Sequence, residues 1–129
     1  MAADFGTSWI ADAVEVTAPD GATVRPLCSL PGTASSAQFE LGPQQVSKAV
    51  SHVSVEEIWF ITAGTGEMWR RQRGREEITA LEPGVCLTIP LGTAFQFRAG
   101  SGGLRAAAVT IPPWPEGNPD EARSEAGRW

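Results

Sequence analysis

Short apolar runs separated by turn-forming residues fill the middle of the chain, and this spacing limits the folds open to it. Strand-like segments fall at 36–41, 46–53, 57–62, 66–71, 76–81, 85–89, 93–98 and 104–111. The 14 glycines and 10 prolines lie mostly between such segments and interrupt any long helical pattern. Because eight short segments joined by short loops suit antiparallel sheets, the spacing predicts an all-β sandwich, barrel or jelly roll.

The two ends of the chain differ from this middle part. Val14 to Val16 and Thr23 to Leu27 can form short first strands beside the turn Pro19-Asp20-Gly21. After Ile111, the run Pro112-Pro113-Trp114-Pro115 lacks the backbone donors that a sheet interior needs. We expect Trp114 to pack this last part on the surface, and the final residues to form a helical turn or to fray.

The length of 129 residues is that of one ordinary domain, which can bury a core without disulfides or a structural metal. We therefore expect a single domain over residues 1–129, with a barrel core at about 36–111 and a C-terminal tail over 112–129. Residues before the core form a short N-terminal arm or the first strands.

Charge and composition exclude several classes of partner. The formal net charge of −5 disfavours nucleic acid and anionic membrane surfaces, so we expect a small-molecule ligand or substrate. No apolar run approaches the length needed to cross a bilayer. Cys28 and Cys86 are too few for a disulfide scaffold, and the N-terminus does not resemble a secretion signal. We therefore expect a cytoplasmic protein with reduced thiols.

The only histidine of the chain, His52, lies five residues before Glu57. Val50 and His52 share one strand face, and Glu57, Trp59 and Ile61 share another. If the intervening residues form a turn, both faces can line the same interior. A histidine and a carboxylate cost free energy to bury unless they are paired, so the two residues form either a buried structural hydrogen bond or a functional pair.

Two blocks of spaced residues surround this pair. In the pattern Gly-x5-His-x-His-x3–4-Glu-x6-Gly, His52 matches the second histidine and Glu57 to Gly64 matches the last part, whereas Gln44 replaces the first glycine and Val50 the first histidine. In the pattern Gly-x5-Pro-x-Gly-x2-His-x3-Asn, the residues present are Gly84, Pro90, Gly92, Phe95 and Ala99. With the other glycine and proline positions of the two blocks kept, the chain resembles the cupin superfamily over roughly residues 36–111.

The resemblance implies a double-stranded β-helix, also called a jelly-roll barrel. It also implies a divalent metal held by three histidines and a glutamate, of which this chain keeps His52 and Glu57 only. Val50 and Phe95 at the other two positions cannot coordinate a metal, and two protein ligands fall short of the usual three or four. We therefore expect no cofactor, and a divalent metal is possible only with His52 and Glu57 among its ligands.

Aromatic residues are expected around the polar pair. Phe95 and Phe97 share a face, and with Trp59 they can line the barrel and hold an apolar or aromatic ligand. Gln38 and Glu40 can reach this pocket if their shared face points inward, and Met68 and Arg70 can do so on the same condition. The candidate substrate contacts are therefore Gln38, Glu40, Val50, Trp59, Met68, Arg70, Phe95 and Phe97.

Three functions remain open on these residues. In the first, an isomerase, cyclase or lyase uses His52 and Glu57 as general acid and base without a metal. In the second, the barrel binds a small molecule and has lost the chemistry. In the third, Gln38 or Glu40 completes an atypical metal site. The resemblance also implies a homodimer, and exposed edge strands and the Trp114 segment give a physical reason for one.

Overall fold

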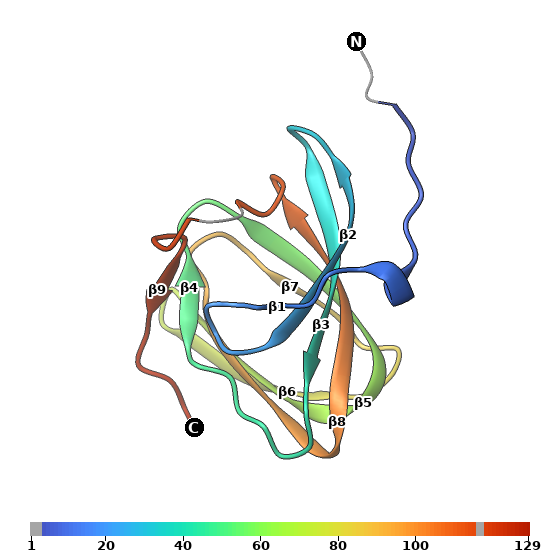
Figure 1. Ribbon diagram of the computed structural model, residues 1–129. Helices are drawn as coiled ribbons and strands as arrows, with labels where there is room; N and C mark the ends of the chain where they lie inside the picture. The colour runs from blue at the N-terminus through green and yellow to red at the C-terminus, as the bar shows by residue number, and fades with distance from the viewer. Residues whose placement is uncertain (1–3, 116–117) are drawn as a thin grey trace.

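The computed structural model describes residues 4–115 and 118–129, and within them the fold is antiparallel β with one short 3-10 turn, η1 (Ile10–Asp12) (Figure 1). The strands are β1 (Val16–Thr17), β2 (Thr23–Leu30), β3 (Ala34–Leu41), β4 (Val50–His52), β5 (Glu56–Gln72), β6 (Arg75–Leu81), β7 (Cys86–Ile89), β8 (Ala94–Ile111) and β9 (Ala122–Ser124). The all-β fold predicted from the spacing of the apolar runs is confirmed.

One curled sheet contains all nine strands, and two long strands hold it together (Figure 1). The first part of β5 pairs with β7 and with the last part of β8, and the second part of β5 pairs with β6 and with the first part of β8. Strands β3 and β4 also pair with β8, so the sheet continues in the order β1, β2, β3, β8, β4 and β9. The result is a rolled sheet with an enclosed interior, as predicted for a jelly roll.

Each long strand combines two of the predicted segments. The residues around Gly64 and those at 99–103, which were predicted as turns, instead form irregularities within β5 and β8, where the pairing register shifts. A Cβ at Gly64 would overlap the backbone carbonyl of Gly103, and one at Gly66 would overlap that of Arg98. These glycines therefore allow close approach of two strands and do not reverse the chain.

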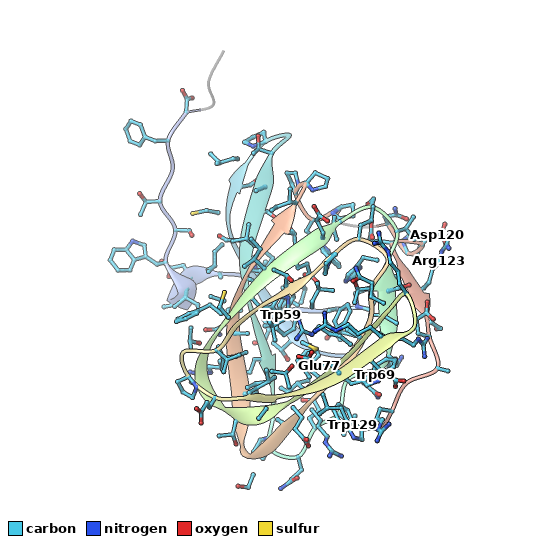
Figure 2. All side chains as sticks on the ribbon, turned by 180° about the vertical axis from the view of Figure 1, so that it is seen from behind. Trp59, Trp69, Glu77, Asp120, Arg123 and Trp129 are labelled. Carbon is cyan, nitrogen blue, oxygen red and sulfur yellow. The ribbon has the colours of Figure 1, made fainter. Side chains whose placement is uncertain are left out.

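The start of β5 shows how the sequence directs side chains to the interior. Its residues alternate from Glu56 to Ile61 between exposed and buried, with Glu57, Trp59 and Ile61 inside. Trp59 lies within the roll (Figure 2) and is 1% exposed. The buried core also includes Phe39, Leu41, Met68, Leu81, Ile89, Phe95, Phe97 and Leu104.

The C-terminal residues differ from their prediction. Residues 122–124 form strand β9 and pair with all three residues of β4, where a helical turn or frayed end was expected. Further along, the backbone N–H groups of Arg128 and Trp129 donate to the side chain of Gln96. The pattern of apolar residues gave no sign of a strand because β9 is a short strand at the end of the sheet, in which Ala122 is half-buried and Arg123 and Ser124 are exposed. Among the described residues, no helix is long and apolar enough to span a membrane.

Candidate functional site

A small cavity lies beside His52 at one end of the roll. Its volume is about 10 Å³, which is room for about one water molecule. Besides His52, its lining includes Asp20 from the turn between β1 and β2, Glu57 from β5, and Trp114 from the C-terminal segment. Polar groups from three distant parts of the chain therefore meet at one enclosed space.

His52 lies between two carboxyl groups. Its Nε2 is 3.6 Å from Glu57 Oε2, and its Nδ1 is 3.5 Å from Glu121 Oε2. All three side chains are buried, with exposed fractions of 7% for His52 and 1% for each glutamate. Both distances are longer than a hydrogen bond, so the predicted proximity of His52 and Glu57 is found without a direct hydrogen bond between them.

Glu57 is a buried carboxyl group without hydrogen-bond partners. Neither of its oxygens has one, and the same holds for the nearby Trp59 indole nitrogen and for His52 Nδ1. Burial, together with the charge of Asp20, raises the pKa of Glu57 to about 8, although the nearby Trp59 indole N–H acts to lower it. Asp20 is also buried, and burial raises its pKa to about 6 even though the backbone N–H of Ala22 donates to it. At neutral pH Glu57 is therefore a protonated carboxylic acid.

The pKa of His52 moves in the opposite direction. Burial lowers it, although the charge of Glu121 opposes this effect. The imidazole is therefore neutral at neutral pH, and the nearby Glu121 carboxylate favours its remaining proton on Nδ1. This leaves the lone pair of Nε2 directed toward Glu57. A basic imidazole and an acidic carboxyl group at one cavity form a pair suited to proton transfer.

Glu121 is the site residue that the sequence did not reveal. It accepts hydrogen bonds from the backbone N–H groups of Val53 and Ser54 and from the Ser54 hydroxyl. Burial opposes its ionisation, but these hydrogen bonds outweigh burial and lower the pKa of Glu121. Its surrounding sequence, Asn118-Pro119-Asp120-Glu121, is polar and has no strand or helix period. Only the pairing of β9 with β4 brings it to His52, so no local signal could have found it.

The aromatic residues predicted around the pair are present but largely fill the interior. Trp59 stacks on Phe39 at 4.9 Å between ring centroids and meets Phe97 edge to face at the same distance. Phe95 and Trp114 lie against His52 at 5.6 and 5.1 Å. Phe95, Trp59 and Val50 border the cavity, whereas Phe97 is packed behind Trp59 and does not.

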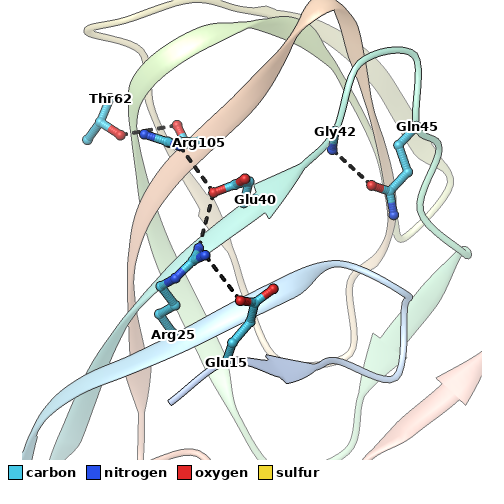
Figure 3. A network of polar contacts seen from close by, with 7 residues as sticks. All are labelled: Glu15, Arg25, Glu40, Gly42, Gln45, Thr62 and Arg105. Atoms are coloured by element: carbon cyan, nitrogen blue, oxygen red, sulfur yellow. Dashed lines mark hydrogen bonds and ion pairs between the residues drawn. The ribbon is translucent and has the colours of Figure 1, made fainter. Parts of the chain in front are cut away.

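The conditional placement of Gln38 and Glu40 at the pocket was wrong. Phe39 is the buried residue of this part of β3, so both of its neighbours point to the other face. Glu40 there accepts hydrogen bonds from Arg25 and Arg105 (Figure 3). Alternation predicts which residues of β3 share a face but not which face is buried, and the apolar ring of Phe39 occupies the inward position.

Met68 and Arg70 are likewise not at the pocket. Met68 is fully buried in the core, and the guanidinium of Arg70 donates to the Thr88 carbonyl, Thr79 Oγ1 and Glu77. Both residues lie in the second part of β5, where Met68 is the register partner of Phe97 and Arg70 that of Phe95. Neither of the two borders the cavity.

The residues around His52 do not fit the four-ligand metal site that the resemblance implies. Val50 and Phe95 occupy two of its positions, and Val50 pairs with Phe95 across β4 and β8. Within residues 4–115 and 118–129, no three His, Cys, Asp or Glu side chains are placed to hold a metal ion together.

Comparison with known proteins identifies structural neighbours only. No family model and no curated protein sequence matches the chain. Pac13 from Streptomyces, a nucleoside dehydratase, has a TM-score of 0.72 and 10% identity over 95% of this chain and 92% of its own. KdgF from Halomonas sp. has a TM-score of 0.72 and 12% identity over 88% of this chain and 98% of its own.

A third neighbour is longer than this chain. CapF from Staphylococcus aureus, a capsular polysaccharide assembling protein, has a TM-score of 0.72 and 10% identity over 87% of this chain. The match covers 34% of CapF, so the chain spans about a third of that protein. At such low identities, the three likenesses show a shared fold.

Proposed function

Since the chain has the cupin fold of these neighbours, we propose that it is a small-molecule enzyme of that fold in which His52 and Glu57 transfer protons. The observation that carries the proposal is a buried carboxyl group without hydrogen-bond partners that faces the chain's only imidazole across a cavity. A buried polar group left unpaired costs about 1–3 kcal/mol, a cost that a binding partner would remove.

The pair suits a reaction that moves a proton next to a carbonyl. His52 Nε2 takes a proton from the carbon beside the carbonyl while the Glu57 carboxylic acid donates its proton to a leaving hydroxyl. A C–H bond and a C–O bond break, a C=C bond forms, and water leaves. The imidazolium then returns its proton to the Glu57 carboxylate 3.6 Å away, and the pair is reset.

The surroundings of the pair support each part of this reaction. The Glu121 carboxylate, 3.5 Å from Nδ1, stabilises the imidazolium that forms. Burial keeps bulk water away from Glu57 and keeps it protonated until it acts. Among isomerisation, cyclisation and elimination, we favour elimination of water, because Pac13 is a nucleoside dehydratase and other structures hold its variants with uridine.

The test compares wild type with His52→Gln on β-hydroxycarbonyl compounds the size of a nucleoside or sugar. Loss of water is followed by mass spectrometry, and deuterium uptake beside the carbonyl by NMR in heavy water. We expect His52→Gln to lower turnover on the order of 10²- to 10⁴-fold with an unchanged melting temperature. Gln72→Ala, at an exposed position of β5, is the matched control and should keep full turnover. Turnover that survives in His52→Gln would overturn the proposal.

Two other functions are outcomes of the same series. A ligand that raises the melting temperature of wild type but is never transformed would identify a binding module without chemistry. A stoichiometric divalent metal, found by elemental analysis of protein purified without added metal, would instead favour the atypical metal site. Either result would contradict the proposal that His52 and Glu57 alone carry out acid–base catalysis.

We also propose a homodimer that forms through the outer face of β5 and β8. Ile58 and Phe60 on β5 are 43% and 48% exposed, and Val109 and Ile111 on β8 are each 38% exposed. Ile58 is the register partner of Val109, so these side chains are neighbours on one face. A group of exposed apolar side chains at this position favours contact with a second copy.

Light scattering of the double variant Ile58→Lys/Phe60→Lys tests the dimer. We expect this variant to be monomeric at concentrations where wild type is dimeric. Ile78→Lys, at a 40% exposed position on β6, is the matched control and should leave the dimer intact. A wild type that is monomeric throughout would contradict the proposal.

A further inference from the structure

A large groove lies outside the His52 cavity and shares part of its lining. The groove has a volume of about 1080 Å³ and runs between β2, β3 and the C-terminal segment. This is slightly above the usual range for small-molecule sites, which is about 300–1,000 Å³. Ala18, Pro19, Phe39 and Trp114 border both spaces. The groove therefore shares wall residues with the cavity that His52 and Glu57 border.

Trp114 borders both the groove and the cavity. Its ring is perpendicular to that of His52, with 5.1 Å between the ring centroids, and its backbone N–H donates to Ser35 Oγ on β3. Ser35 is also within 2.6 Å of Thr110 on β8, so this contact ties the C-terminal segment to the roll.

The groove has no charged residue among the described residues that line it. Its apolar surface comes from residues such as Val16, Val24 and Leu27, and its hydrogen-bonding groups include the hydroxyls of Ser29, Ser35 and Ser36. Such a lining suits a molecule with an apolar ring and hydroxyl groups.

The arginine on the strands that form the groove is paired with carboxylates. Arg25 is the only basic residue of β1, β2 and β3, and its guanidinium donates to Glu15 and Glu40 (Figure 3). At the inner end, the ionisable side chains that border the cavity are His52 and the carboxyl groups of Asp20 and Glu57. An anion entering from the groove would lose water and meet no positive charge, which costs free energy.

We propose that this groove is the outer part of the ligand site, that it takes an uncharged small molecule carrying an apolar ring and hydroxyl groups, and that Trp114 separates it from His52 and Glu57. The link to catalysis rests on the function proposed above. The ligand class rests on the groove itself and is tested without turnover.

The ligand class is tested with phenyl β-D-glucoside and phenyl β-D-glucuronide, which share a ring and differ by a carboxylate in place of a hydroxymethyl group. We expect the glucoside to shift the indole N–H signal of Trp114 in NMR spectra and to bind about tenfold more tightly than the glucuronide. Equal or tighter binding of the glucuronide, or no shift with either compound, would overturn the proposal.

A charge placed in the groove gives an independent check. Ser29→Arg adds a cation at an exposed position of the lining and should remove the preference for the glucoside. Ser101→Arg, at an exposed position outside the lining, should leave the preference unchanged. An unchanged preference in Ser29→Arg would mean that the probes bind elsewhere, and the groove would be excluded.

Chemical modification tests whether Trp114 separates the groove from His52. Diethyl pyrocarbonate modifies histidine, and His52 is the only histidine of the chain. We expect Trp114→Ala to speed modification of His52 about tenfold or more, and bound glucoside to slow it again. Trp9→Ala, at a 73% exposed position, is the control and should not change the rate. An unchanged rate in Trp114→Ala would overturn the proposal that Trp114 separates the groove from His52. Because neither readout needs turnover, failure here is distinct from failure of the acid–base proposal.

Discussion

Gln96 and Glu57 are both buried polar side chains, but they differ in whether the fold supplies hydrogen-bond partners. Gln96 Nε2 donates to the carbonyls of Ser47 and Trp129, and Gln96 Oε1 accepts from the N–H groups of Arg128 and Trp129. Glu57 is buried to the same degree and has no hydrogen-bond partner on either oxygen. Full pairing at Gln96 anchors the chain, whereas the missing pairs at Glu57 leave its acid free to act on a ligand.

The largest loss of stability on substitution is expected at Gln96. Gln96→Ala leaves buried backbone groups of Ser47 and Trp129 without partners and should lower the free energy of unfolding by about 2–4 kcal/mol. Urea denaturation measures the change. A loss below about 0.5 kcal/mol would show that Gln96 does not anchor the last residues, and the contrast with Glu57 would fail.

A change at Glu57 should act mainly on the pH dependence of stability. The pKa of Glu57 is about 8 in the folded protein and near 4.5 in the unfolded chain, so the folded state holds the proton more tightly. Its contribution to stability is complete below pH 4.5 and is lost as the pH rises toward 8, by up to about 1.4 kcal/mol per pH unit.

Denaturation of Glu57→Gln across this pH range provides the measurement. Subtracting its free energies of unfolding from those of wild type should give a difference that falls with rising pH. Glu56→Gln, at the exposed neighbouring position on the other face of β5, should give a flat difference. A flat difference for Glu57→Gln as well would mean that Glu57 is ionised in the folded protein.

The smallest effect is expected at Arg98, which contacts the same end of the chain as Gln96 but at the surface. Its guanidinium lies 4.2 Å from the centre of the Trp129 ring and donates to Glu67, and its side chain is 40% exposed. Arg98→Gln should cost less than about 1 kcal/mol by urea denaturation. A loss of unfolding free energy equal to that in Gln96→Ala would mean that the charge of Arg98 holds the end of the chain as strongly as the buried hydrogen bonds of Gln96 do.

The barrel was predictable because its signals are local. Turn residues between short apolar runs predicted the strands, and alternation from Glu57 to Ile61 placed their side chains inside. His52 and Glu57 were predicted to lie together for the same reason, since the two strands that carry them are joined by a short turn. The prediction from local signals failed at Gly64. This glycine allows two strands to approach closely, but in the sequence it is indistinguishable from a turn glycine.

The rest of the site could not be predicted because it depends on contacts between distant parts of the chain. Asp20 looked like an ordinary turn residue, and nothing in its sequence shows that the carboxyl group is buried against Glu57. Glu121 and Trp114 belong to a segment without periodicity and reach His52 only through tertiary packing. Gln38 and Glu40 were misplaced because alternation alone does not say which face of β3 is buried.

The short strand β4 has a consequence for the order in which the protein folds. Val50 pairs with Phe95 on one side and with Ser124 on the other, so both neighbours of this strand lie far along the chain. Closing such long loops is entropically costly, and strands with distant partners are slow to form. The strand that carries His52 therefore has sheet partners only when β8 and β9 are in place, so formation of the acid–base pair depends on closing these long loops.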